Sequence, residues 1–151
     1  MRRQEKEIKD PSAIDEIIKA SRVFRLAMVD RDRPYVVPLN FGYQDQALYF
    51  HSAREGRKID ILRSNPHVCF EFDILEKLNK NAEACKWGAD FKSVIGEGKA
   101  VILDDPEEKR KGFAAIMARY SDRTFEFSHE NVEKTAVIRI DIEWMTGKTS
   151  L

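Results

Sequence analysis

Apolar side chains recur at every second position in several separate stretches of the chain, and this alternation is the main indication of its fold. A period of two is typical of strands that bury one face. It predicts six strands, over residues 23–29, 35–43, 47–52, 68–72, 91–103 and 135–144. Glycines at 96 and 98 fall in the middle of the fifth strand and predict a bend or bulge there.

Three stretches have helical rather than strand periodicity. Ser12 is an expected N-cap with an acid three residues later, which predicts a short amphipathic helix. A second helix is expected over residues 57–64, where Asn65-Pro66 would end it. A third begins at Asp104-Asp-Pro and carries an apolar stripe of Phe113, Ile116, Met117 and Tyr120. Residues 74–88 lack a clear period and are expected to form a loop.

Six strands with short turns and interposed helices favour an antiparallel barrel, closed or nearly closed, over a parallel doubly wound sheet. We therefore expect a mainly β protein whose helices flank the barrel. With 151 residues, the chain has the length of one domain, and residues 1–151 are expected to form it. Arg119 and the run Lys109-Arg110-Lys111 are expected to lie on the solvated face of the third helix.

Charge and composition narrow the classes of partner. The 26 basic and 26 acidic side chains balance, which argues against nucleic acid because phosphate backbones select proteins with a basic excess. No apolar run approaches the roughly 20 residues of a membrane span, and the charged N-terminus is unlike a signal peptide, so a cytoplasmic protein is expected. The three histidines and two cysteines have neither metal-ligand nor disulfide spacing.

Residues 51–58 combine features of an anion site. His51 and Ser52 end a strand, a loop with Gly56 follows, and Arg57 and Lys58 open a helix. Cations at a helix N-terminus are locally unfavourable, which suggests an anion between them and the free backbone N–H groups. Basic residues in loops are also commonly just solvated. The residues alone leave both interpretations open.

The strand over residues 35–43 has one unusually small and polar face, formed by Val36, Pro38, Asn40 and Gly42. A flat aromatic ligand lying along a strand needs such close access to the backbone. Pro38 lacks an N–H for ladder pairing, so the same pattern is also typical of a sheet edge or a bulge.

Several motifs, in this order, resemble the FMN-binding split barrels of the pyridoxamine 5′-phosphate oxidase type, in particular the nitroimidazole-resistance subgroup. The resemblance covers nearly the whole chain after the first helix. The motifs are Tyr35-Val-Val-Pro-Leu-Asn-Phe-Gly-Tyr43, Leu48-Tyr-Phe-His-Ser52, Glu55-Gly-Arg-Lys58, Asn65-Pro-His-Val-Cys-Phe-Glu71, Ser93-Val-Ile-Gly-Glu-Gly-Lys-Ala100 and Ile138-Arg-Ile-Asp-Ile-Glu-Trp-Met-Thr-Gly-Lys148.

The resemblance implies a six-stranded antiparallel split β-barrel that forms a homodimer, with FMN bound at the interface between the two chains. The strand that contains Val37, Pro38, Leu39 and Asn40 would run beside the isoalloxazine ring. Ser93 and Trp144 would contact or adjoin the flavin from the interface. The ribityl phosphate would be held by His51, Ser52, Arg57 and Lys58.

The same resemblance implies an FMN-dependent oxidoreductase that uses NADH or NADPH to reduce a small acceptor, with nitroaromatic compounds as one class. Pyridoxamine-phosphate oxidase proper has a C-terminal extension with an arginine that binds substrate phosphate, and here the last cation is Lys148. Vitamin B6 oxidation is therefore not expected. The alternative is a non-catalytic protein that binds flavin, haem or a deazaflavin, because split barrels serve all of these functions.

Overall fold

The computed structural model of the protein describes residues 3–150. Helices of both kinds are η1 (Gln4–Lys6), α1 (Pro11–Ala20), α2 (Arg57–Ser64), η2 (Ala84–Lys86), α3 (Pro106–Ala118) and α4 (His129–Lys134). The strands are β1 (Glu7–Ile8), β2 (Phe24–Asp30), β3 (Arg33–Leu39), β4 (Gly42–Gln44), β5 (Ala47–Ala53), β6 (His67–Asn79), β7 (Gly88–Ile102) and β8 (Thr135–Thr149).

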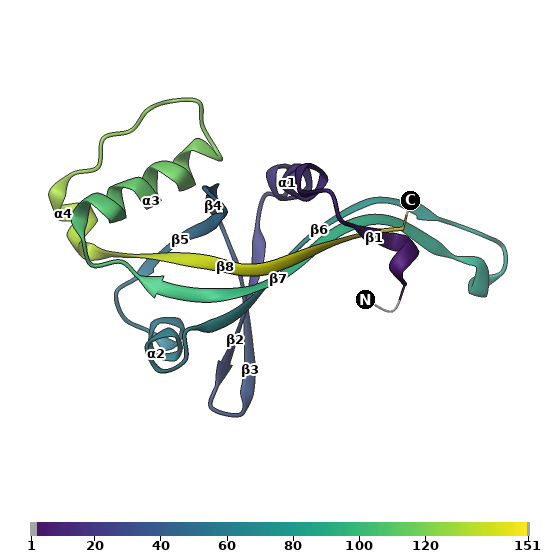
Figure 1. Cartoon of the computed structure of the whole chain (residues 1–151), viewed down its shortest axis with the longest axis horizontal. Coiled ribbons are helices and arrows are strands. Elements are labelled where there is room, and N and C mark those ends of the chain that lie inside the picture. The colour runs from purple at the N-terminus through teal and green to yellow at the C-terminus, as the bar shows by residue number, and fades with distance from the viewer. Residues whose placement is uncertain (1–2, 151) are drawn as a thin grey trace.

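All pairings among the described strands are antiparallel and join them into one sheet in the order β3-β2-β6-β7-β8-β5-β4, with β1 added to β8. The sheet curls into a barrel that is not closed, because its two edge strands, β3 and β4, follow one another in the chain without pairing. Figure 1 shows α3 and α4 on one side of this sheet and α2 on the other. The mainly β split barrel with flanking helices is thus confirmed.

The expected strand over residues 35–43 is two strands, and together with β1 this makes eight strands where six were predicted. The chain turns inward between β3 and β4 because Phe41 is fully buried. Its N–H donates to the hydroxyl of Tyr120 (3.1 Å) instead of to a ladder partner. A Cβ on Gly42 would lie 2.5 Å from the backbone of Ala115, so a side chain at this position would prevent the close approach of α3.

The prediction of a loop over residues 74–88 is wrong for residues 74–79 and 88, which belong to strands. β6 runs on to Asn79 and pairs with β7 back to Gly88, and together they form the long arm at the right of Figure 1. A bulge at Glu76 shifts the register, so Leu75 faces Phe91 while Leu78 faces Ala89. The two leucines therefore share a face although they are three residues apart, which hides the period of two in the sequence.

An irregularity does occur at the glycines of the fifth strand, but the extra residue is Glu143 in the neighbouring strand β8, whereas β7 pairs with β6 there without a shift. Pairing of β7 with β8 shifts between Glu97 and Gly98. A Cβ on Gly96 would lie 2.3 Å from Cζ of Phe70 and 2.6 Å from the carbonyl oxygen of Trp144. Only glycine leaves room for this close contact between the strand and the aromatic core.

The interior of the barrel is built on a cluster of five fully buried phenylalanines. Their ring centroids lie 5.0 to 6.1 Å apart in edge-on, tilted and stacked pairs. Such geometry contributes stabilisation beyond the burial of apolar area. The cluster consists of Phe24, Phe41, Phe50, Phe70 and Phe72.

The helices differ from the sequence expectation at three residues. Asp10, not Ser12, caps α1, since its carboxylate accepts the Ser12 N–H (3.1 Å) and Pro11 occupies the first helical position. Arg119 does not lie on a solvated face, because it donates to the last carbonyls around α1, those of Ile18, Lys19 and Ser21. Lys109 is also not solvated: only 8% of it is exposed.

Candidate functional site

The N-terminus of α2 differs from those of the other described α-helices. Asp10, Asp105 and Ser128 cap α1, α3 and α4 with side-chain oxygens. The N-cap of α2 is Gly56, which has no side chain to accept a hydrogen bond, and its φ of 122° and ψ of 167° suit glycine alone. The first N–H groups of α2 therefore lack the side-chain acceptor that the other helices have.

Lys58, in the first turn of α2, is half-buried and has no carboxylate within 4 Å among the described residues. Its ammonium lies over the ring of Phe50, 5.4 Å from the centroid. Burial lowers the pKa of Lys58. Burial and, to a lesser extent, the nearby Lys58 charge also lower the pKa of His51. An anion at this position would relieve both effects, since it favours the charged form of each group.

Arg57 is held by two groups from the β2–β3 hairpin. The carboxylate of Asp30 lies 3.1 Å from its guanidinium, and the ring of Tyr35 lies beneath it at 4.3 Å. This fixes the cation at the helix N-terminus. Sequence reasoning missed both partners, because Asp30 belongs to a polar turn and Tyr35 to an alternating strand, and neither signal indicates a contact with residue 57.

His51 and Ser52 are adjacent in β5 and therefore project to opposite faces of the sheet. Ser52 shares its face with the buried Phe50. His51 points toward α3, where its ring lies 6.2 Å from that of Phe113, and Phe113 stacks on Phe127 at 5.1 Å. His51 and Ser52, which were predicted to act together, therefore lie on opposite sides of β5. Ser52 lies on the interior side of β5, and His51 begins an aromatic row on the α3 side.

The predicted flavin strand is the edge strand β3, which pairs with β2 on one side only. Val36, Pro38 and Asn40 are exposed, while Val37 and Leu39 pack against the core. The free edge leaves backbone N–H and C=O groups available to a flat ligand. Because their side chains pack against the core, Val37 and Leu39 would have to contact such a ligand through their backbone atoms.

Ser93 and Trp144 do not join this site within one chain. Ser93 lies in β7 nine residues before Ile102, which is about 30 Å of extended strand. Ile102 is the end of β7 that borders α2, since it lines a cavity together with Ile59. Trp144 is 46% exposed and donates from Nε1 to Glu97 (3.1 Å) across β7 and β8. Both residues lie on the exposed side of the sheet.

The donor set suits the phosphate end of FMN. It comprises two cations, Arg57 and Lys58, and the backbone N–H groups that follow Gly56, with the hydroxyl of Ser52 at the end of the preceding strand. Anions bind preferentially where such groups converge. Within residues 3–150, no three His, Cys, Asp or Glu side chains gather where they could hold a metal ion. None of the helices in that range has the length and hydropathy of a membrane span.

Comparison with known proteins gives two matches at the level of sequence. The family model described as pyridoxamine 5′-phosphate oxidase matches residues 10–149. An uncharacterised protein, RA0666 of Rhizobium meliloti (strain 1021), is 38% identical over 55 residues, a match that spans 36% of each chain.

Solved structures match over much more of the chain. A candidate 5-nitroimidazole antibiotic resistance protein from Bacteroides thetaiotaomicron is 35% identical, covers 95% of this chain and 86% of its own, and superposes with a TM-score of 0.86. A FAD-binding protein from Mesorhizobium loti is 27% identical over 94% of this chain and 96% of its own, with a TM-score of 0.70.

At lower identity, the flavocytochrome Anf3 of Azotobacter vinelandii shares the fold, with 20% identity, a TM-score of 0.87 and coverage of 100% of this chain and 72% of its own. Both the family model and the Bacteroides structure cover nearly all the described residues, which include the α2 N-terminus and the edge strand β3. The chain therefore belongs to the pyridoxamine 5′-phosphate oxidase family, and among its members it resembles the nitroimidazole-resistance proteins.

Proposed function

We propose that this protein is a flavin-dependent oxidoreductase that binds FMN, with the cofactor phosphate at the N-terminus of α2. The observation that carries the proposal is the uncapped helix start that bears the half-buried Lys58, which has no acidic partner within residues 3–150. A half-buried, unpaired cation costs free energy in the unliganded protein, so its presence is best explained by an anionic ligand. Flavin binding by the Mesorhizobium relative supports this choice of ligand.

The flavin ring would lie against the free edge of β3, next to the exposed Val36 and Pro38. Once bound, the flavin supplies the redox chemistry. The chain's own groups would bind the phosphate and exclude water from the ring through the apolar edge. His51 is neutral near pH 7 because its pKa is lowered, so it accepts a hydrogen bond more readily than it donates a proton there.

We also propose that the working unit is a homodimer with its flavin sites at the interface. The support is the outer face of the sheet, where one row of paired residues crosses five strands: Val36, Ala27, Cys69, Glu97 and Trp144. Val36, Trp144 and the neighbouring Ile95 are each 44% exposed or more. A second chain on this face would cover these side chains and would bring the partner copies of Ser93 and Trp144 toward the cofactor.

The proposed reaction is reduction of a small acceptor by electrons from NADH or NADPH. The Bacteroides protein's described link to 5-nitroimidazole resistance supports nitroaromatic acceptors as the class to test first. Because the site has no assigned covalent nucleophile, the protein would act by positioning and by tuning charge around the ring.

The test is anaerobic mixing of the flavin-loaded protein with each reduced nicotinamide while the absorbance of oxidised flavin is followed. Bleaching at a catalytic rate, and its reversal on addition of a 5-nitroimidazole, is the expected result. Flavin that binds but is not bleached would refute the oxidoreductase and leave a flavin-binding protein. Protein that binds no flavin at all would refute the cofactor assignment as well.

A further inference from the structure

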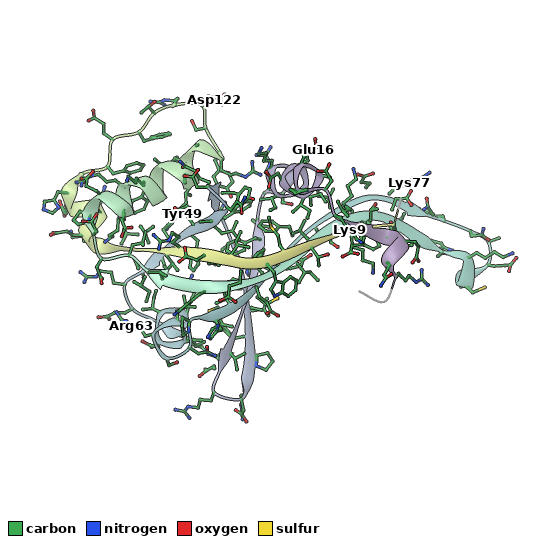
Figure 2. The ribbon with its side chains drawn as sticks, in the orientation of Figure 1. Lys9, Glu16, Tyr49, Arg63, Lys77 and Asp122 are labelled. Carbon is green, nitrogen blue, oxygen red and sulfur yellow. The ribbon has the colours of Figure 1, made fainter. Side chains whose placement is uncertain are left out.

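A second cationic site lies on the other flank of α2. A cavity of about 370 Å³ opens between α2, the end of β7, the start of α3 and α4. Its apolar wall includes Ile59, Leu103 and Val132. Three cations from three different segments also line it: Arg54 from the loop before α2, Arg63 from α2 and Lys109 from α3. Figure 2 labels Arg63 on α2, below the end of β7.

Lys109 is the unusual member of this group. It is only 8% exposed, although lysine is almost never buried without a partner. Within the described residues, its ammonium donates no hydrogen bond and has no carboxylate within 4 Å, while its backbone N–H donates to the carbonyl of Asp105 (3.0 Å). Burial lowers its pKa, and the charge of Arg54 lowers it further. The fold thus holds a lysine in a place that disfavours its charge, with its side chain along the wall of an open cavity.

The surrounding charges do not neutralise the cations. Asp104 and Glu133 also line the cavity and act on Lys109 at longer range, in the direction that raises its pKa. Neither carboxylate forms an ion pair with Arg54, Arg63 or Lys109 within residues 3–150. Three positive charges therefore face two negative ones, and the excess is positive.

This cavity is separate from the phosphate site at the start of α2. Arg63 follows Ile59 by four residues, so both lie on one helix face, toward the cavity. Arg57 instead contacts Asp30 and Tyr35 in the β2–β3 hairpin. The two sites thus use different faces of α2 and of the loop before it.

We propose that the cavity binds the phosphoryl group of a small organic ligand, with Arg54, Arg63 and Lys109 as its ligands. Two guanidinium groups and one ammonium match the several oxygens of a phosphate, and carboxylates of a ligand would use fewer of these donors. The apolar wall of Ile59, Leu103 and Val132 would accept the organic part. The volume lies at the lower end of the range for ligand pockets, roughly 300–1,000 Å³.

A phosphoryl group could come from two sources here. One is a free phosphate ester or nucleotide that binds to the flavin-loaded protein. The other is the adenylate half of FAD, if the isoalloxazine end occupies the edge of β3 and the chain passes over the loop before α2. The first source does not depend on the proposed flavin site, and the second one does.

Titration calorimetry of FMN-loaded protein with pyrophosphate and with ADP tests the free ligand. Lys109→Met and Arg63→Gln each remove one cation from the cavity, while Lys111→Met removes an exposed cation from the same helix as a matched control. We expect binding by the wild type and by the control, and at least tenfold weaker binding by the two cavity variants.

Titration of the apoprotein with FMN and with FAD tests the other source. Here the cavity variants would weaken FAD binding at least tenfold and leave FMN binding unchanged. Two outcomes overturn the proposal. In the first, the wild type binds neither pyrophosphate nor ADP, and the cavity variants change the affinities for FMN and FAD to the same extent. In the second, pyrophosphate and ADP bind to the wild type and to Lys109→Met with equal affinity. Loss of FMN binding in every variant and in the wild type would instead contradict the flavin site.

Thermal denaturation without any probe separates loss of the site from loss of the fold. Lys109→Met replaces a largely buried lysine, whose ammonium has no ion pair within residues 3–150, with an apolar side chain of similar length. Its melting temperature is therefore expected to equal or exceed that of the wild type. A variant that melts higher but binds pyrophosphate or ADP more weakly supports the site, whereas a variant that melts lower shows that the charge of Lys109 stabilises the unliganded fold and contradicts it.

Discussion

Replacement of Lys58 by methionine tests the phosphate site without disturbing the barrel. Lys58 is half-buried over Phe50, and burial lowers its pKa, so its charge is unfavourable in the unliganded protein. Methionine retains the length and apolar contacts of the side chain but cannot bind an anion. The variant should therefore fold normally and lose cofactor affinity.

The size of the loss follows from the interaction removed. A hydrogen bond to a charged group contributes about 1.5–3 kcal/mol. Since each 1.4 kcal/mol corresponds to about a factor of ten in affinity, the dissociation constant for FMN should rise about 10- to 150-fold. Arg57 and the free N–H groups of α2 remain, so binding should weaken and not disappear.

The assay is quenching of FMN fluorescence on titration of the apoprotein, with a thermal melt of each unliganded variant alongside. Lys77→Met, on the exposed arm labelled in Figure 2, makes the same change in net charge far from the site and serves as the control. Equal FMN affinity in Lys58→Met and wild type would refute the phosphate site. A lower melting temperature in Lys58→Met alone would show that its charge has a structural role.

Three further predictions follow from the backbone and from the titration of one side chain. Gly56→Ala forces a residue with a Cβ to adopt φ 122°, so the free energy of unfolding in urea should fall by about 1–3 kcal/mol and FMN should bind more weakly. Gly96→Ala places a Cβ 2.3 Å from the ring of Phe70 and should cost about 1–3 kcal/mol in the same assay, whereas Gly88→Ala, with open space around it, should cost under about 1 kcal/mol. His51 has a lowered pKa in the folded state, so the unfolded state binds more protons at acidic pH. The stability due to the neutral form of His51 is full above about pH 6.5 and is lost as the pH falls from there toward the folded pKa. His51→Gln should therefore flatten the fall in urea stability below about pH 6.5, and an unchanged slope would contradict this.

Much of the barrel could be predicted from the sequence, because burial of one face imposes a period of two. The boundaries of α2 were confirmed for a local reason, the proline that follows the helix. The glycines marked the position of the register shift correctly, but not the strand that carries the extra residue, which is β8. The arm could not be predicted, since its bulge at Glu76 removes the alternation that would have revealed it. The division of β3 from β4 depends on Tyr120, which is distant in the sequence.

Only part of the candidate site could be predicted from the sequence. Arg57 and Lys58 are adjacent to the helix start that uses them, so a local pattern could find them. The contacts of Arg57 with Asp30 and Tyr35, and the burial of Lys109, arise from elements brought together only by the fold. A basic residue such as Lys109, which the sequence predicts to be solvated, can thus line a cavity. No local sequence pattern indicates this burial.

The central claim is that the N-terminus of α2 holds the phosphate of a flavin. Binding of FMN and of riboflavin, which lacks the phosphate, tests it most directly when both are titrated into the same apoprotein. The loss of a phosphate that interacts with Arg57, Lys58 and the helix N–H groups should weaken binding at least a hundredfold, on the order of 3 kcal/mol. Equal affinity for FMN and riboflavin would contradict the account.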